Sequence, residues 1–373
     1  MAGIADRRAR VVVFPLPFQG HISPMLQLAG ALHARGLDVT VLHTAFNAPD
    51  PARHPAFSFV AVPDVIPANV PSNGIAKILA LNAVMEASGH VRNALTSLLE
   101  EDEERPRLAC LFIDSTLTAA QKAAAGLGLP TLVLHTGSAA CFRLFRSYDM
   151  LYDKGYLPAT ESNLHLPIKE LPPLQVRDLF DPSKLPNKEI GQKILNLATE
   201  TTTNSSGAII NTFEDLESHE LEMIRFELGR VEKTELPEGF ESAVQGRGMV
   251  IEWAPQQEVL AHSAVGGFWT HSGWDSTLES VHEGVPMLSR PLFGDQLANG
   301  RYVQDTWKIG FLLEGVLERG MIGRAIARLM EESEGAMVRE RAKDLKEKAQ
   351  LCLKSNGSSQ VAVDKLVDHI LSL

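Results

Sequence analysis

Cysteine is scarce in this chain of 373 residues, which contains only Cys110, Cys141 and Cys352. Because the three lie far apart, they form no disulfide framework and no CxxC metal site, and we expect a reducing compartment. Positive charge is also in short supply, since 35 lysines and arginines stand against 46 acidic residues, for a formal net charge of −11. Phosphate backbones are bound by basic surfaces, so this balance disfavours nucleic acid as a partner.

Other absences narrow the class of protein further. The longest apolar run near the start, residues 11–18, contains two prolines. It is too short for a signal segment or a membrane span, so we expect a cytoplasmic protein without membrane insertion. Gly126 and Gly128 lack the third glycine of a dinucleotide-binding loop, which disfavours an NAD-dependent enzyme. His262 and His271 have no cysteine or carboxylate at ligand spacing, so no metal site is expected.

The residues that are present suit two packed domains, with 45% hydrophobic and 22% charged side chains. In the first half, short apolar runs alternate with helical patterns. We expect strands at 11–14, 39–42, 57–62, 108–113, 131–134 and 208–211, and helices at 22–35, 76–99, 119–125 and 212–226. This alternation predicts an α/β domain with a doubly wound parallel sheet, whose ligands collect beyond the carboxyl ends of the strands. His21 and Asp114 stand at two such ends.

The pattern of strands and helices restarts at about Gly229. We expect strands at 249–252, 267–270, 286–289 and 310–313, and helices at 257–262, 276–283, 296–306, 316–332, 336–353 and 359–371. This half therefore predicts a second α/β unit, with a ligand edge formed by the loops around residues 253, 271–279 and 293–296.

The densest chemical pattern lies in the second half. From Gly273 to Thr277 a strand turns into a helix, where free backbone amides, hydroxyls and the positive helix end suit a phosphate. His271 can add a donor to the same anion. The side chains suited to the rest of a nucleotide sugar are Trp253 for a base, Glu279 for a ribose, and Asp295 and Gln296 for sugar hydroxyls.

Each of these residues also has a purely structural interpretation. Trp253 and Trp269 fit a hydrophobic core, and His271 fits a buried histidine with satisfied hydrogen bonds. Ser276 and Thr277 are ordinary helix-cap residues. In the first half, His21 can be a helix-start residue without a chemical task, and Asp114 can cap the turn into the next helix.

Three stretches of the sequence resemble one enzyme family. The segment WAPQQEVLAHSAVGGFWTHSGWDSTLESVHEGVPMLSRPLFGDQ, residues 253–296, spans all 44 positions of the signature box of plant family 1 UDP-glycosyltransferases. PFQGHISPMLQLAGAL near the N-terminus and NTFEDLE at 211–217 are similar to the same family. A narrower similarity is to the grass enzymes that glucosylate benzoxazinoids and related phenolics.

The resemblance implies a GT-B architecture, in which two Rossmann-like domains face each other across a cleft. It implies an acceptor-binding domain at 1–228, a UDP-sugar-binding domain at 229–355, and a C-terminal helix at 356–373 that packs back on the first domain. A metal-dependent GT-A enzyme is disfavoured, since no DxD motif stands at a strand end. UDP-sugar enters as a co-substrate, and neither cofactor nor metal is expected.

The resemblance also assigns roles, position by position. His21 matches the general base and Asp114 its acidic partner. The donor-site positions are Trp253 and the Ala254 backbone at uracil, Gln256 and Glu279 at the ribose, His271, Gly273, Trp274, Asp275 and Ser276 around the diphosphate, and Asp295 and Gln296 at the sugar. The terminal Gln296 suggests glucose. For the acceptor we expect a pocket near Phe18, Thr136–Ser138, Phe142 and the helix at 82–86.

These roles make chemical sense. A histidine with an ordinary pKa of about 6.5 can take the proton of an acceptor hydroxyl as the bond to the sugar forms. A carboxylate on its other ring nitrogen fixes the tautomer and stabilises the imidazolium. The helix N-terminus and His271 can stabilise the charge that develops on departing UDP. Attack from the side opposite to UDP inverts the anomeric centre.

Two features depart from the family pattern. Asp275 stands where the family usually has Asn, and it brings a negative charge to the expected seat of a diphosphate. At ~4 Å and an effective dielectric of ~20, two like charges repel by roughly 4 kcal/mol before screening. The second departure is a missing segment, since only 41 residues separate Asn211 from Trp253 and no VSFGS-like turn occurs. A βαβ unit takes roughly 30 residues or more, so we expect an internal deletion that removes the first strands of the second domain.

The sequence therefore predicts a UDP-dependent glycosyltransferase, with UDP-glucose as the donor. It transfers the sugar with inversion to a hydroxyl of a small secondary metabolite such as a benzoxazinoid or a phenolic. The alternative is a catalytically impaired, truncated paralogue that at most binds an acceptor. Asp275 and the missing segment are the features that favour the alternative.

Overall fold

The computed structural model describes residues 9–67, 70, 74–100, 105–184, 188–224 and 254–373. The chain divides into two compact units. Unit 1 comprises Met1–Pro158, Asp181–Gly229 and Leu353–Leu373, and unit 2 comprises Ala159–Phe180 and Arg230–Cys352. The stretch 159–180 thus groups with unit 2, whereas the division expected from the sequence places it in the first domain.

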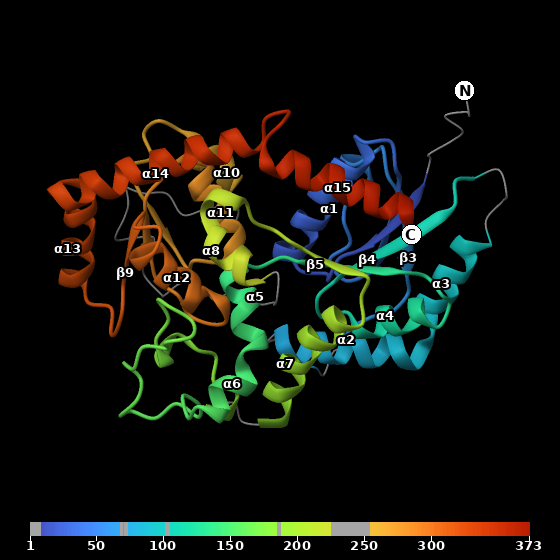
Figure 1. Ribbon diagram of the computed structural model, residues 1–373, viewed down its shortest axis with the longest axis horizontal. Coiled ribbons are helices and arrows are strands. Elements are labelled where there is room, and N and C mark those ends of the chain that lie inside the picture. The colour runs from blue at the N-terminus through green and yellow to red at the C-terminus, as the bar shows by residue number, and fades with distance from the viewer. Residues whose placement is uncertain (1–8, 68–69, 71–73, 101–104, 185–187, 225–253) are drawn as a thin grey trace. The chain divides into compact units, whose positions relative to one another are not determined.

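A six-stranded parallel sheet forms the centre of unit 1, in the order β3–β2–β1–β4–β5–β6 (Figure 1). The strands are β1 (Arg10–Phe14), β2 (Asp38–Thr44), β3 (Ser58–Val62), β4 (Leu108–Asp114), β5 (Thr131–His135) and β6 (Gly207–Ile210). This order is that of a doubly wound nucleotide-binding sheet. The six expected strands and the doubly wound sheet are confirmed.

Helices surround this sheet, and two of them, α2 and α3, replace a single helix expected from the sequence. They are α1 (Gln19–His33), α2 (Gly74–Ser88), α3 (His90–Leu99), α4 (Thr118–Ala125), α5 (Ala139–Arg146), α6 (Tyr148–Asp153), α7 (Lys188–Thr203), α8 (Glu214–Ile224) and α15 (Ser358–Ser372). The single helix expected at 76–99 is wrong, because Gly89 adopts a left-handed φ of 68° and separates α2 from α3. Glycine reaches that conformation without steric cost.

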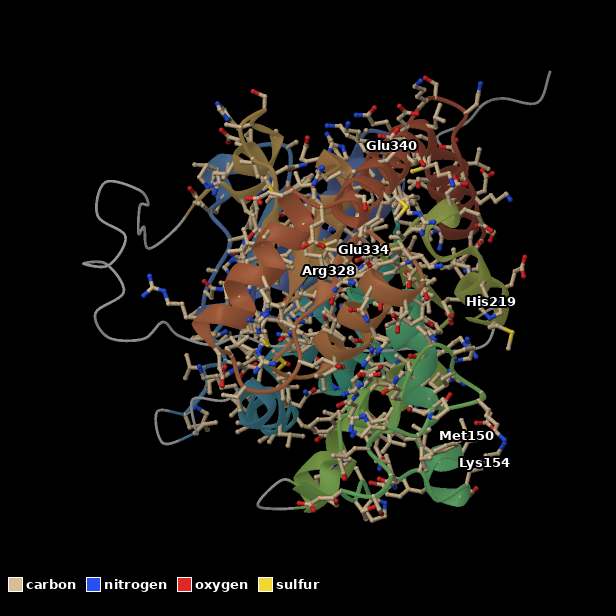
Figure 2. All side chains as sticks on the ribbon, turned by 90° about the vertical axis from the view of Figure 1, so that its left-hand side faces the viewer. Met150, Lys154, His219, Arg328, Glu334 and Glu340 are labelled. Carbon is tan, nitrogen blue, oxygen red and sulfur yellow. The ribbon has the colours of Figure 1, made fainter. Side chains whose placement is uncertain are left out.

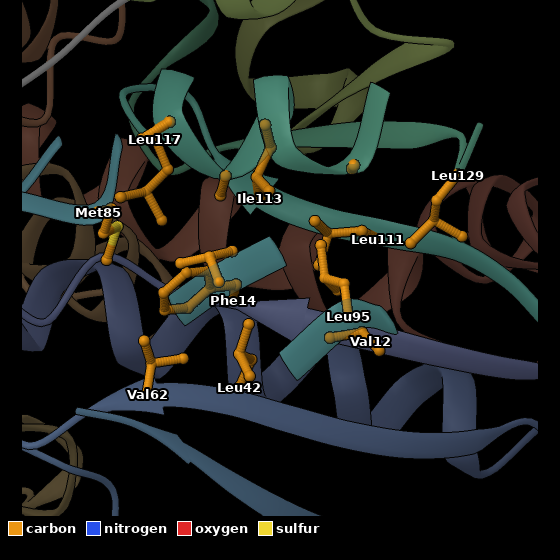
Figure 3. Packing of buried hydrophobic residues seen from close by; sticks show 14 of the residues in the cluster. Val12, Phe14, Leu42, Val62, Met85, Leu95, Leu111, Ile113, Leu117 and Leu129 are labelled. Atoms are coloured by element: carbon orange, nitrogen blue, oxygen red, sulfur yellow. The ribbon is translucent and has the colours of Figure 1, made fainter. Parts of the chain in front are cut away.

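The two faces of the sheet carry separate apolar cores, and β1 shows why. Successive side chains of a strand point to opposite faces. Val12 and Phe14 therefore pack among one set of buried residues (Figure 3), and Val11 and Val13 pack among another. Figure 1 shows α2, α3 and α4 covering the first face, and α1 with α15 covering the second. Ile370 of α15 is fully buried in the second core.

Unit 2 contains a three-stranded parallel sheet, in the order β7–β8–β9, within its described residues. Its strands are β7 (Phe268–Thr270), β8 (Met287–Ser289) and β9 (Gly310–Leu312). Its helices are α10 (Gln256–Ala261), α11 (Trp274–Glu283), α12 (Asp295–Asp305), α13 (Arg319–Met330) and α14 (Ser333–Cys352). The strand expected at 249–252 lies outside the described residues.

Polar contacts fix α12 within unit 2. The guanidinium of the buried Arg301 forms ion pairs with Asp178, at 3.1 Å, and with Glu314, at 2.6 Å. The hydroxyl of Tyr302 donates to the carbonyl of Pro172 at 3.2 Å. Because Pro172 and Asp178 belong to the stretch 159–180, these contacts join that stretch to α12.

An exposed ion pair joins α13 to α14. Arg328 and Glu334 face each other with two contacts of 2.7 and 2.8 Å (Figure 2). The same guanidinium lies 3.9 Å from the centre of the Phe311 ring. Because solvent screens exposed ion pairs, this pair adds little to stability. The cation–π contact with Phe311 adds to it, and Phe311 and Leu329 are buried in the same apolar cluster.

Candidate active site

The imidazole of His21 meets the carboxylate of Asp114 within unit 1. Nδ1 of His21 lies 2.6 Å from Oδ2 of Asp114, and both side chains are buried. His21 is in the first turn of α1, the helix that follows β1 after a short loop, and Asp114 is the last residue of β4. Because β1 and β4 are parallel neighbours, their carboxyl ends lie at the same edge of the sheet, and this brings the two side chains together.

The turn after β4 holds Asp114 for this contact. Oδ1 of Asp114 accepts hydrogen bonds from the backbone N–H of Thr116 at 3.1 Å and from its hydroxyl at 2.9 Å. The hydroxyl of Thr136 lies 3.1 Å from Nδ1 of His21. A carboxylate on Nδ1 favours the tautomer that carries its proton there, which leaves Nε2 as the basic nitrogen. The pair can therefore take a proton from a hydroxyl through Nε2.

Glu217 organises the start of α5, a role that sequence reasoning missed. Its Oε2 accepts from the N–H of Ala139 at 2.8 Å and from the hydroxyl of Thr212 at 2.6 Å, and its Oε1 accepts from the N–H of Ala140 at 3.0 Å. A carboxylate is favoured at this positive helix end. Burial nevertheless raises the pKa of Glu217 to about 7. Glu217 ends the NTFEDLE motif, but its partner Ala139 lies 78 residues earlier, so the local sequence does not reveal the contact.

In unit 2, the predicted phosphate-binding turn connects β7 to α11. Gly273 is the N-cap of α11 and, being glycine, supplies no capping side chain. The first N–H groups of an α-helix have no partner within the helix, so they are the groups that an anion can use. A side chain at position 273 would come within 2.5 Å of Nε2 of His271. Glycine there is therefore what lets the imidazole lie against the turn. Asp275 is half-buried in the first turn of α11.

Three of the predicted donor-site side chains form one hydrogen-bonded group. The amide Nε2 of Gln256, at the start of α10, donates to Oγ of Ser276 at 2.9 Å and to Oε2 of Glu279 at 2.6 Å. Ser276 and Glu279 lie on one side of α11 because they are three residues apart. Ala254 lies just before α10 and is half-buried. The structure therefore brings together the two residues expected at the ribose and one of those expected at the diphosphate, Ser276.

Asp295 and Gln296 lie at the start of α12, and both are buried. Oε1 of Gln296 accepts from the N–H groups of Leu292 at 3.0 Å and Phe293 at 3.2 Å, so this side chain shapes the loop before the helix. Oδ2 of Asp295 accepts from the amide of Asn299 at 2.9 Å. Sequence reasoning missed Asn299, which lies beyond the signature box.

The tryptophans of the second half have different positions. Trp253 lies outside the described residues. The indole of Trp274 is only 1% exposed and packs against that of Trp307 with ring centres 5.9 Å apart, so only the backbone of Trp274 is placed for an anion. Trp269, by contrast, is 43% exposed on β7, and its interpretation as a core residue is wrong.

The residues expected around an acceptor separate into two groups. Phe18 lies edge-on to His21 with ring centres 6.4 Å apart, and Thr136 contacts the same imidazole. Asn82 is buried, and its amide donates to the carbonyl of Thr116 at 2.9 Å. Asn82 thus holds the turn after β4, which is a structural task, rather than offering its amide to a ligand.

Neither a metal cluster nor a membrane-spanning helix is found in the part of the chain that the structure describes. No group of three or more His, Cys, Asp or Glu side chains there is arranged to hold a metal ion. Likewise, no helix among the described residues combines the length and the apolar character needed to cross a bilayer.

Sequence comparison relates the chain to known enzymes. Residues 230–341 match a family model described as UDP-glucoronosyl and UDP-glucosyl transferase. The chain is 39% identical to the DIMBOA UDP-glucosyltransferase BX8 of Zea mays, over 430 residues that cover 90% of this chain and 93% of that protein. It is 34% identical to UDP-glycosyltransferase 76F2 of Arabidopsis thaliana, over 456 residues that cover 97% of each. Both alignments are longer than the 373 residues of the chain, so each relative contains residues that have no counterpart here.

Comparison with solved structures gives the fold. The structure of Phytolacca americana UGT2, complexed with UDP-2fluoro-glucose and pterostilbene, matches with a TM-score of 0.83 and 23% identity, covering 97% of this chain and 99% of that one. Medicago truncatula UGT71G1, complexed with UDP-glucose, matches with a TM-score of 0.81 and 21% identity, covering 98% and 99%. At this level of identity the likeness concerns the fold alone.

Proposed function

The chain belongs to the plant family 1 UDP-glycosyltransferases and has their GT-B fold, and on this premise we propose that it glucosylates a small secondary metabolite. The proposed donor is UDP-glucose, and the acceptor group is a hydroxyl of a phenolic or a benzoxazinoid. Support for this class of acceptor comes from the two DIMBOA glucosyltransferases of Zea mays, which are 39% and 37% identical to this chain.

The contact between His21 and Asp114 is the observation that carries the proposal. With Nδ1 engaged 2.6 Å from the carboxylate, Nε2 is the nitrogen that takes the proton of the acceptor hydroxyl. The hydroxyl oxygen forms a bond to C1 of the sugar while the bond from C1 to the UDP oxygen breaks. Asp114 stabilises the imidazolium that results. The electron pair leaves with UDP, and attack from the opposite side inverts the anomeric centre.

On the donor side, the proposal places the diphosphate at the start of α11. There the backbone amides of Gly273 and Trp274, the hydroxyl of Ser276 and the imidazole of His271 stabilise the charge on departing UDP. Asp275 belongs to the same turn. The remaining proposed contacts are Trp253 and Ala254 with uracil, Gln256 and Glu279 with the ribose, and Asp295 and Gln296 with the sugar.

No cofactor or metal takes part in the proposed reaction, in which UDP-sugar is a co-substrate. The backbone amides and imidazole at α11 supply the stabilisation that a leaving diphosphate requires. We also propose a cytoplasmic location. In its favour, Cys110, Cys141 and Cys352 are free thiols buried in the structure, which suits a reducing compartment.

The test is product formation by the purified chain of 373 residues. UDP-glucose is incubated with a panel of phenolics and benzoxazinoids, and glucosides are identified by mass spectrometry and by the anomeric coupling in NMR. The proposal predicts a glucoside of inverted configuration with at least one acceptor, and a rate lower by about 10²–10⁴ from His21→Ala. A folded wild-type chain that yields no glucoside with any acceptor would contradict it.

The second candidate is a catalytically impaired paralogue that at most binds an acceptor. Two observations favour it, namely the negative charge of Asp275 at the proposed diphosphate seat and the residues that relatives have and this chain lacks. The melting temperature in the presence of UDP separates the two candidates. A ligand that binds only the folded state must raise it, so an unchanged melting temperature supports the impaired paralogue.

A further inference from the structure

We propose that Asn299 is a positioning residue that couples the sugar-binding end of α12 to the diphosphate-binding turn before α11. This inference rests on the proposed function, because it names a further residue on which donor binding depends. Asn299 lies outside the signature box and one helical turn after Asp295.

The side-chain amide of Asn299 makes two hydrogen bonds in different directions. Its Nδ2 donates to Oδ2 of Asp295 at 2.9 Å and to the backbone carbonyl of Ser272 at 3.1 Å. All three residues are fully buried. In a buried site these two bonds are not exchanged for water, so the amide ties Asp295 and Ser272 to one another.

The contact with Asn299 helps to hold the backbone of Ser272 in an unusual conformation. Its φ of 65° lies in the left-handed region, which a serine adopts only when its surroundings hold it there. One further contact restrains it, because the N–H of Ser272 donates to the hydroxyl of Thr270 at 3.0 Å. Ser272 directly precedes Gly273, the N-cap of α11, so its conformation determines where the first amides of α11 point.

The remainder of α12 is anchored independently of Asn299. Arg301 forms ion pairs with Asp178 and Glu314, and the hydroxyl of Tyr302 donates to Pro172. A change at Asn299 should therefore leave the helix in place and act locally, on Asp295 and on the turn. We therefore expect the substitution to misplace the groups that bind the donor without unfolding the helix.

Asn299→Asp is the discriminating variant, because it keeps the shape but replaces the donor by an acceptor. Facing two oxygens, the new carboxylate can make neither bond. The matched control is Tyr302→Phe, which removes a partly buried hydrogen bond that joins the same helix to Pro172, away from the turn. A second comparison is Asp295→Ala, which removes the proposed sugar contact and one of the two bonds of Asn299 but leaves its bond to Ser272.

The experiment measures binding of UDP and of UDP-glucose to the full chain by calorimetry. For Asn299→Asp we expect the Kd of UDP to rise about tenfold and that of UDP-glucose to rise further. Asp295→Ala should weaken the binding of UDP-glucose but not that of UDP. Tyr302→Phe should change neither Kd. Wild-type affinity for both ligands in Asn299→Asp, or an equal loss in Tyr302→Phe, would overturn the inference.

Amide hydrogen exchange without ligand provides a readout that is independent of donor binding. Faster exchange at residues 272–276 is expected in Asn299→Asp, with α14 unchanged, whereas unchanged exchange at 272–276 overturns the coupling. A wild-type chain that binds no UDP would contradict the proposed function, and exchange at the turn would then decide the inference about Asn299 by itself.

Discussion

Asp114 uses its two carboxylate oxygens for two different tasks. Oδ1 accepts two hydrogen bonds from Thr116, and Oδ2 lies 2.6 Å from Nδ1 of His21. The carboxylate is thus fixed by its own strand-to-helix turn before it meets the imidazole. Because the position and the tautomer of His21 are both set in this way, Nε2 is available as a base without reorganisation during the reaction.

Removal of either member of this pair should lower turnover rather than donor binding. We expect His21→Ala to reduce kcat by about 10²–10⁴, the usual contribution of a general base. Asp114→Asn should reduce kcat by a smaller factor, because the amide can still orient the ring but cannot stabilise the imidazolium. Initial rates of glucoside formation provide the measurement, with the Kd of UDP as the control. A His21→Ala variant of wild-type kcat would exclude His21 as the base.

Asp275 should weaken donor binding through like-charge repulsion. Asp275→Asn removes the charge while keeping the shape, so we expect the Kd of UDP to fall by about tenfold or more at low salt. Calorimetry at low salt and at ~1 M salt tests the mechanism, since screening reduces the gain at high salt. Asp275→Glu, which retains the charge, is the control. If Asp275→Asn and the wild type bind UDP equally, the carboxylate does not face the diphosphate.

Glu217 should make stability depend on pH. Burial raises its pKa in the folded state from 4.5 to about 7, so the folded state holds this proton more tightly than the unfolded state does. Its contribution to stability is therefore fully present below about pH 4.5 and is lost as pH rises through about 7. Urea unfolding of the wild type and of Glu217→Gln at several pH values provides the measurement.

Glu217→Gln cannot titrate at this position, so the comparison isolates one group. Relative to this variant, the wild type should lose stability as the pH rises from about 4.5 to about 7, the interval between the pKa values of the unfolded and folded states. The substitution also disturbs the start of α5, and that adds an offset that does not depend on pH. A difference between the two proteins that stays constant over this range would contradict the assigned titration.

Arg301 should be important for the stability of unit 2. Burial raises the pKa of Asp178, and the guanidinium of Arg301 opposes that effect. Arg301→Leu leaves this carboxylate buried without its cation, and we expect a loss of about 3–5 kcal/mol in the free energy of unfolding. Urea unfolding measures the loss. The double variant Arg301→Leu with Asp178→Asn should recover part of it, and an equal loss in single and double variants would show that the ion pair is not the cause.

Regular elements could be predicted from the sequence because their signals are local. The β-branched run at 11–14 predicts a buried strand, and β1 is found at Arg10–Phe14. The helix at 76–99 was predicted as continuous because its apolar spacing continues past Gly89, whose φ of 68° ends α2. Helices α5, α6 and α7 were not predicted, and the start of α5 is capped by a carboxylate 78 residues away.

The candidate site was predictable only in part. His21 and Asp114 could be placed together because parallel strands bring their carboxyl ends to one edge. The contacts of Glu217 and Asn299 could not be predicted, because each residue has a tertiary partner that no sequence spacing reveals. The consequence of Asn299 for the turn residue Ser272 follows from the structure alone. The roles of the donor-site residues remain predictions.

The most direct test of the account is a crystal of the full chain soaked with UDP. The account predicts that the diphosphate lies at the start of α11, within hydrogen-bond distance of the Gly273 and Trp274 amides and the Ser276 hydroxyl, with the ribose at Glu279. If UDP were bound elsewhere while this turn stayed empty, the assignment of the donor site would be contradicted.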